Sequence, residues 1–181
     1  MNIKRMTLVG MFAALLAIIS PLQIILPFSP VPITLQVAGV ALTASILGSK
    51  LGTLSVIIYI LLGVMGLPVF AGFTSGIPRL IGPTGGYILG FVLSAYLIGR
   101  LLEEKRNPGY LYVLMVNVLG LLVVYLIGTT QLSLTYTHSF TKALAAGVIP
   151  YIIPDLIKLG ITSIIVVQVQ RVLTKSNLLI L

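Results

Sequence analysis

The side chains of this sequence best suited to chemistry are Asp155 and Lys158, which lie three residues apart inside an apolar segment, residues 149–169. A charge at the centre of a lipid bilayer costs about 2.5–3.5 kcal/mol on insertion scales. A carboxylate accepts hydrogen bonds from a polar solute, and an ammonium donates them. Because the sequence carries so few charges elsewhere, this pair is the first candidate for a solute-binding site.

The pair belongs to a polar pattern with helical spacing. Tyr151, Asp155, Lys158 and Thr162 follow one another at intervals of four, three and four residues, which places them on one face of a helix. Pro154 is expected to loosen the backbone beside them. The face is either the polar wall of a binding site or an ion pair that only neutralises itself inside a bundle. We favour the polar wall of a binding site, because both charges are expected at the same membrane depth as the glycine-rich segment of residues 70–87.

Composition places the chain in the membrane. Of its 181 residues, 58% are hydrophobic and 8% are charged, whereas a soluble domain carries about 25% charged residues. The absence of cysteine excludes disulfides, thiol catalysis and cysteine-based metal sites. With one histidine and three carboxylates, a metal site built from protein ligands alone is not expected.

The elements that position the pair are predicted to be six membrane-spanning helices in an all-α bundle that forms one domain over residues 1–181. A helix needs about 20 apolar residues to cross a bilayer. Gly48, Ser49, Lys50 and Gly52 interrupt a stretch too long for one crossing, which predicts a tight hairpin. The predicted spans are residues 7–26, 35–49, 51–67, 84–102, 110–129 and 149–170.

The net charge of +8 fits this arrangement of spans better than it fits nucleic-acid binding. With six spans and both termini on one side, that side receives most of the basic residues, and the other receives only Arg79 and Lys142. The positive-inside rule then places both termini in the cytoplasm. The apolar start is either a signal peptide or a retained first span, and we favour the span because no clear cleavage site follows it. The basic residues on the predicted cytoplasmic side are Lys4, Arg5, Lys50, Arg100, Lys105, Arg106, Arg171 and Lys175.

Two connecting segments are unusual. Residues 27–34, here called the strap, contain three prolines and are predicted to be stiff and extended. Residues 70–87, here called the glycine-rich loop, are apolar between their glycines. Irregular backbone at membrane depth must be covered by protein. The glycine-rich loop is therefore predicted to dip over the bundle and seal a cavity.

The end of this loop supplies further candidates. Tyr87, Phe91 and Ser94 share one helical face, and Tyr87 directly follows a run with glycine at positions 82, 85 and 86. Because glycine has no side chain, another group can approach the backbone closely here. Tyr87, which follows directly, is therefore predicted to contact a ligand. The run is not a phosphate-binding loop, because no strand precedes it and no Gly-Lys-Ser/Thr follows. Ser75 and His138 leave an intramembrane hydrolase as an alternative of a different class, although a solvated histidine explains His138 more simply.

Small residues form stripes on the first two spans. Gly10, Ala13, Ala14 and Ala17 occupy the first, and Ala38, Ala41, Ser45 and Gly48 occupy the second. Small residues allow close approach of helices. Either stripe is expected to pack within the bundle. For the stripe on the first span, docking of another membrane subunit is the alternative.

Four segments together resemble the biotin-specific substrate-binding (S) component of energy-coupling-factor (ECF-type) vitamin transporters, the BioY family. They are residues 30–36 (Pro-Val-Pro-Ile-Thr-Leu-Gln), residues 66–72 (Gly-Leu-Pro-Val-Phe-Ala-Gly), residues 82–87 (Gly-Pro-Thr-Gly-Gly-Tyr) and the pair Pro154-Asp155 with Lys158. The resemblance implies high-affinity biotin uptake by a multi-pass protein of a prokaryotic cell membrane, with a pocket near the outer face and lids from the first and third loops. It also implies a transmembrane coupling (T) subunit and two ATPase subunits as partners, with docking through Gly10, Ala13, Ala14 and Ala17. No cofactor and no catalytic activity are expected in this chain, because its partners hydrolyse the ATP. Another vitamin, or biotin uptake without the ATPase module, remains an alternative.

The resemblance and the polar face together nominate a binding site. Its predicted members are Asp155, Lys158, Tyr87, Arg79, Thr74, Phe73, Phe91, Gln36 and Tyr151. Asp155 can accept from the ureido N–H groups of biotin, and Lys158 or Arg79 can neutralise its carboxylate. The pose in which Lys158 bridges Asp155 and the carboxylate is equally open. Some relatives carry arginine where this chain has Ile88 and asparagine where it has Thr74, so Arg79 is expected to supply the cation.

Overall fold

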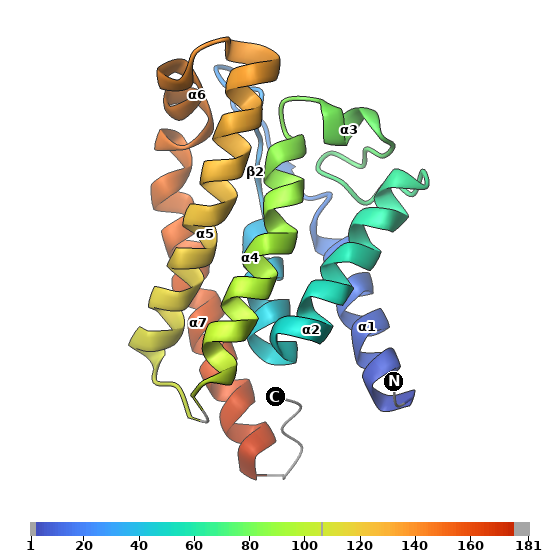
Figure 1. Ribbon diagram of the computed structural model, residues 1–181, viewed down its shortest axis with the longest axis vertical. Coiled ribbons are helices and arrows are strands. Elements are labelled where there is room, and N and C mark those ends of the chain that lie inside the picture. The colour runs from blue at the N-terminus through green and yellow to red at the C-terminus, as the bar shows by residue number, and fades with distance from the viewer. Residues whose placement is uncertain (1–2, 106, 176–181) are drawn as a thin grey trace.

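The computed structural model describes residues 3–105 and 107–175, so Arg106 lies outside the described residues. The chain forms a bundle of helices (Figure 1). Within the described part of the chain, four helical segments are long and apolar enough to cross a membrane: Gln36–Val64, Gly85–Glu103, Tyr110–Thr137 and Phe140–Leu173. The long helices of the bundle are α1 (Ile3–Ile19), α2 (Gln36–Val64), α4 (Gly85–Glu103), α5 (Tyr110–Leu132) and α7 (Ile152–Lys175).

Helix α2 reverses its direction at Gly48, as the sequence predicts. Gly48 adopts φ 79° and ψ −176°, which no helical residue shares and which favours glycine. A Cβ built on Gly52 would lie 2.8 Å from the Cα of Ala44, whereas a straight helix separates residues eight apart by about 12 Å along its axis. The carboxylate of Glu103 accepts hydrogen bonds from the backbone N of Ser49 at 2.7 Å and from its Oγ at 2.9 Å. It thereby caps the second half of α2.

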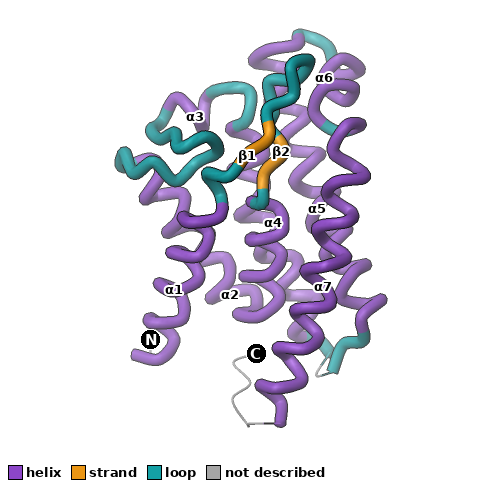
Figure 2. The backbone as a smooth tube through the Cα atoms, turned by 180° about the vertical axis from the view of Figure 1, so that it is seen from behind, coloured by secondary structure: helices purple, strands orange, loops and turns teal. Residues whose placement is uncertain are grey.

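Among the described residues, the long helical segments of the bundle number six when the two halves of α2 are counted separately. One end of the bundle holds the first turn of α1, the bend in α2, the end of α4, the start of α5 and the last turn of α7 (Figure 1). The strap and the glycine-rich loop lie at the opposite end (Figure 2). The segments predicted to carry most of the basic residues therefore gather at one end of the bundle.

The irregular end contains short elements. Strands β1 (Gln23–Ile24) and β2 (Ile33–Thr34) pair antiparallel and hold the strap against the chain that precedes it. The glycine-rich loop contains one helical turn, α3 (Pro78–Ile81). A π-helical turn (Ser133–Thr137), α6 (Phe140–Gly147) and a 3-10 turn (Ile149–Tyr151) join α5 to α7.

Three local predictions need correction. The first span ends at Ile19 rather than at residue 26, because Pro21 cannot continue the helix and the chain enters β1 instead. The connection between the last two predicted spans, for which no helix was predicted, forms one over residues 140–147. Pro154 lies in the first turn of α7, where its missing N–H disrupts nothing, so it does not loosen the helix beside Asp155.

A buried polar network crosses the bundle. Asn117 of α5 accepts a hydrogen bond from Ser45 Oγ at 3.1 Å and donates one to Ser163 Oγ at 3.1 Å. All three side chains are fully buried. Since buried polar groups are costly without partners, this network favours one relative rotation of α2, α5 and α7, and these helices carry much of the site described next.

Candidate substrate-binding site

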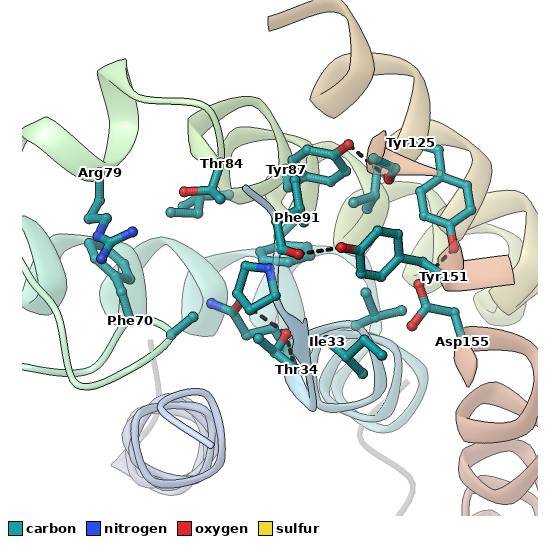
Figure 3. A pocket seen from close by; sticks show the side chains of 18 of the residues that line it. Ile33, Thr34, Phe70, Arg79, Thr84, Tyr87, Phe91, Tyr125, Tyr151 and Asp155 are labelled. Carbon is teal, nitrogen blue, oxygen red and sulfur yellow. Dashed lines mark hydrogen bonds between the residues drawn. The ribbon is translucent and has the colours of Figure 1, made fainter. Parts of the chain in front are cut away.

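A cavity opens at the irregular end of the bundle, beneath the strap and the glycine-rich loop (Figure 3). The strap, α2, the glycine-rich loop, α4, α5 and α7 all contribute to its wall. It holds about 660 Å³ of space not filled by atoms, its open mouth included. Its lining is mostly apolar with a few polar side chains, as is typical of small-molecule sites.

One end of the cavity carries Asp155 and its partners. Asp155 is only 4% exposed. Its Oδ1 lies 2.5 Å from the Nζ of Lys158, one turn further along α7. Its Oδ2 accepts a hydrogen bond at 2.7 Å from the hydroxyl of Tyr125 on α5. The carboxylate is therefore oriented by two donors, with lone pairs left to accept from a ligand.

The strap is tied to this polar end. Lys158 Nζ also donates a hydrogen bond to the backbone carbonyl of Thr34 at 2.7 Å. The hydroxyl of Tyr151 bonds to Ser29 Oγ at 2.8 Å and to the carbonyl of Val31. Ser29 in turn donates to the carbonyl of Ala146 at 2.7 Å. Tyr151 of the 3-10 turn and Lys158 of α7 thus hold the strap over the cavity.

Aromatic side chains form the middle of the wall. Phe91 is buried, and Tyr87 donates its hydroxyl proton to the carbonyl of Gly147 at 2.9 Å. A Cβ on Gly128 would lie 2.4 Å from the Tyr87 ring, and one on Gly147 would lie 2.1 Å from its hydroxyl oxygen. Both glycines therefore make the slot that holds Tyr87. Phe70 meets the ring of Tyr59 edge-to-face, with centroids 5.8 Å apart.

The other end of the cavity carries Arg79, from α3. Figure 3 places Arg79 and Asp155 at opposite sides of the cavity, with Tyr87 and Phe91 between them. No hydrogen bond or ion pair of the Arg79 side chain occurs among the described residues. The three acidic side chains, those of Glu103, Glu104 and Asp155, are engaged elsewhere. This cation is therefore available to an anionic ligand.

Gln36 and Thr74 complete the polar lining. Gln36 Nε2 donates to the Tyr59 hydroxyl at 2.8 Å, and its Oε1 accepts from Thr34 Oγ1 at 3.1 Å. Thr74 pairs with Phe70 through backbone hydrogen bonds, and its Oγ1 donates to the carbonyl of Ala71 at 2.9 Å. Both residues line the cavity while they brace its wall.

The structure brings all the predicted binding residues except Phe73 to this one cavity. Phe73 is 66% exposed and does not line it. Its φ of 57° belongs to the tight turn between Phe70 and Thr74, which leaves the buried position to Phe70. Thr162 and Ser94 are buried but lie outside the cavity lining.

Sequence reasoning missed Tyr125, which orients Asp155. Its only signal in the sequence was its hydroxyl within an apolar span, and Tyr110, Tyr112 and Thr129 of the same span carry hydroxyls too. Only the packing of α5 against α7 places the Tyr125 hydroxyl on the carboxylate of Asp155. The alternative pair Ser75 and His138 does not line the cavity, and no hydrogen bond joins the two side chains among the described residues. His138 is exposed, as expected of a solvated histidine.

The small-residue stripe on α1 divides between two faces. Gly10 and Ala14 are exposed, and a Cβ on Gly10 would meet nothing within 4 Å. Ala13 is buried, and Ala17 packs against the core. The inward face of α1 runs through Val9, Ala13 and Leu16. Ala13 therefore belongs to the interior and not to a docking surface, and the exposed part of the stripe is Gly10 and Ala14.

Comparisons with known proteins agree over nearly the whole chain. The family model described as the BioY family matches residues 1–175. The biotin transporter BioY of Thermotoga maritima is 42% identical over 168 residues, which cover 93% of this chain and 96% of that protein. The probable biotin transporter BioY of Pyrococcus horikoshii is 44% identical over 170 residues, which cover 94% and 98%. A crystal structure of the S-component for biotin from an ECF-type ABC transporter matches with a TM-score of 0.87 and 29% identity, covering 93% of this chain and 92% of the other.

Proposed function

The chain belongs to the BioY family, and from that membership we propose that it is the membrane-embedded, high-affinity biotin-binding S-component of an ECF-type transporter. The observation that carries this proposal is one cavity with an acceptor-rich end at Asp155, an unpaired cation at Arg79 and aromatic rings between them. Biotin has matching parts in the same order. It carries a ureido group, an apolar ring and tail, and a carboxylate.

The charges favour one pose of biotin. Asp155 and Lys158 already neutralise each other at 2.5 Å, whereas Arg79 has no partner among the described side chains. The ligand carboxylate gains most where a cation is unpaired, and a second anion beside Asp155 would be repelled. We therefore place the carboxylate at Arg79. The ureido N–H groups then donate to Asp155, and the third ammonium proton of Lys158 is free to meet the ureido oxygen.

The remaining features of the proposal concern the membrane and partners. Six crossings of the cell membrane, with both termini in the cytoplasm, fit the basic end of the bundle and the positive-inside rule. A T subunit and two ATPase subunits would complete the transporter, and the exposed positions Gly10 and Ala14 on α1 are the proposed contact. The sequence lacks a phosphate-loop lysine motif, so this chain would bind biotin without a cofactor or catalysis while its partners hydrolyse ATP. The larger core cluster takes residues from α1, α2, α4, α5 and α7, which supports a single domain.

Equilibrium binding of radiolabelled biotin to the purified protein in detergent, without ATP, tests the proposal. We expect saturation at one biotin per chain and competition only by compounds that keep the ureido ring. Riboflavin or thiamine that bound equally tightly would show that the substrate is different. A complete lack of saturable biotin binding by folded protein would overturn the function.

A further inference from the structure

We propose that Gln131, which does not line the cavity, is the positioning residue that holds Arg79 in place for the carboxylate of the ligand. The inference rests on the proposed function in so far as the ligand carries a carboxylate. It assigns a role to a polar side chain on a membrane-spanning segment that the binding site itself does not use.

Gln131 reaches from α5 to the turn that carries Arg79. Its Nε2 donates one hydrogen bond to the carbonyl of Leu80 at 2.7 Å and another to the carbonyl of Gly82 at 3.0 Å. The last carbonyls of a helix have no partner within the helix. The two amide protons of one glutamine therefore satisfy the C-terminal end of α3.

Helix α3 depends on such anchors. It has only four residues, none of them fully buried, and of these only Leu80 packs against the core, so helical cooperativity and apolar packing hold it weakly. The chain just before it is anchored by the backbone N of Gly76, which donates to the carbonyl of Gly63 at 2.8 Å. The bonds from Gln131 anchor the other end. Arg79 lies between the two anchors, and its own backbone N donates to the carbonyl of Gly76 at 3.2 Å.

The glycine run before Tyr87 makes room for this contact. A Cβ on Gly85 would lie 1.8 Å from the carbonyl oxygen of Leu80 and 2.6 Å from Gln131 Nε2. A Cβ on Gly86 would lie 2.7 Å from Gln131 Cβ. The groups packed closely against Gly85 and Gly86 thus include the side chain of Gln131 and the end of α3.

The functional consequence follows from preorganisation. An arginine on a loosely held turn must be ordered when the carboxylate binds, and that ordering reduces affinity. A ligand without a charge at this end does not use Arg79 and is indifferent to its position. Loss of Gln131 should therefore weaken binding of biotin selectively, and it should do so only while Arg79 is present.

The test compares biotin with biotin methyl ester on the same preparations of wild type, Gln131→Leu and Gln131→Met. The control is Thr130→Val, which removes a hydrogen bond within α5 one residue away. We expect the glutamine variants to lose about tenfold in affinity for biotin and little for the ester, and the control to lose neither. Because both ligands are measured on one preparation, the ratio of affinities is independent of the folded fraction.

Two further measurements decide the role. In the background of Arg79→Ala, Gln131→Leu should cause no further loss of biotin affinity. An additive loss, or equal losses for both ligands, would overturn the assignment. The chain has no cysteine, so a spin label at Ile81→Cys, an exposed position of α3, reports the turn without any ligand. We expect its mobility to rise in Gln131→Leu. An unchanged mobility would overturn the proposal. This measurement needs no ligand, so its outcome stands apart from the proposed function, which fails if the wild type does not bind biotin.

Discussion

The ammonium of Lys158 donates a hydrogen bond to the backbone carbonyl of Thr34 at 2.7 Å, and this bond joins α7 to the strap across the mouth of the cavity. The same ammonium is 2.5 Å from Asp155. Lys158 therefore contacts both the carboxylate of Asp155 in the site and the strap that covers the site. A ligand that bonds to Lys158 or Asp155 would act on the strap as well.

Replacing Asp155 and Lys158 together separates a binding role from a structural one. Either single change leaves a buried charge without its partner, at a cost of about 3–5 kcal/mol in stability. Asp155→Asn combined with Lys158→Met removes both charges at similar volume. We expect this double variant to fold and to lose biotin binding, as measured by thermal unfolding in detergent and by radioligand saturation. Wild-type affinity in the double variant would remove both residues from the site.

Tyr125→Phe removes the donor to Asp155 Oδ2 and leaves the ring in place. A hydrogen bond contributes about 0.5–1.5 kcal/mol, so we expect biotin affinity to fall about three- to tenfold. Tyr112→Phe is the matched control, because its hydroxyl bonds to the carbonyl of Leu101 away from the cavity. If the two variants bound biotin equally well, Tyr125 would not orient the carboxylate for the ligand.

Arg79→Ala should weaken biotin more than biotin methyl ester, because only biotin presents a carboxylate to the missing guanidinium. A charge-assisted hydrogen bond is worth about 1.5–3 kcal/mol, so the loss for biotin should be tenfold or more, on the order of one to two powers of ten. Lys142→Ala removes an exposed cation on α6, at the same end of the bundle as α3, and serves as control. Equal losses for the two ligands in Arg79→Ala would mean that the arginine only orders its loop.

Gly99→Ala tests the close contact between α4 and the hairpin of α2. A Cβ at this position would lie 2.3 Å from the backbone N of Ser49 and 2.4 Å from the carbonyl carbon of Gly48. Backbone cannot yield as a side chain does, so we expect a loss of about 1–3 kcal/mol, seen as a lower midpoint of thermal unfolding. Gly109→Ala, where a Cβ meets nothing within 4 Å, should unfold like the wild type. A Gly99→Ala protein as stable as this control would contradict the hairpin packing.

Ala14→Trp tests the proposed contact with a T subunit. Ala14 is exposed on α1, so added bulk should leave biotin binding intact and abolish uptake into cells or vesicles that contain the complete transporter. Leu122→Trp adds bulk to an exposed position of α5 and should leave uptake near the wild-type level. Loss of biotin binding in Ala14→Trp would show instead that this position packs within the bundle.

The sequence alone predicts the helical segments and the site around Asp155 and Lys158, for reasons of solvation. Apolar runs long enough to cross a bilayer must form helices that satisfy their own backbone. Charges inside such a run are costly enough to mark a functional position. The reversal at Gly48 was also readable, because a tight turn with positive φ requires glycine and the combined run is too long for one crossing.

The tertiary structure decided which neighbours those segments face. It placed Tyr125 on Asp155, buried Phe70 in place of Phe73, turned Ala13 inward beside the exposed Ala14, and carried Gln131 to the turn of Arg79. In a soluble helix, alternation of polar and apolar residues would have indicated the inward face. A helix in a bilayer meets lipid as apolar as its own core, so that pattern disappears and the rotation of each helix is decided by close packing and by a few buried hydrogen bonds.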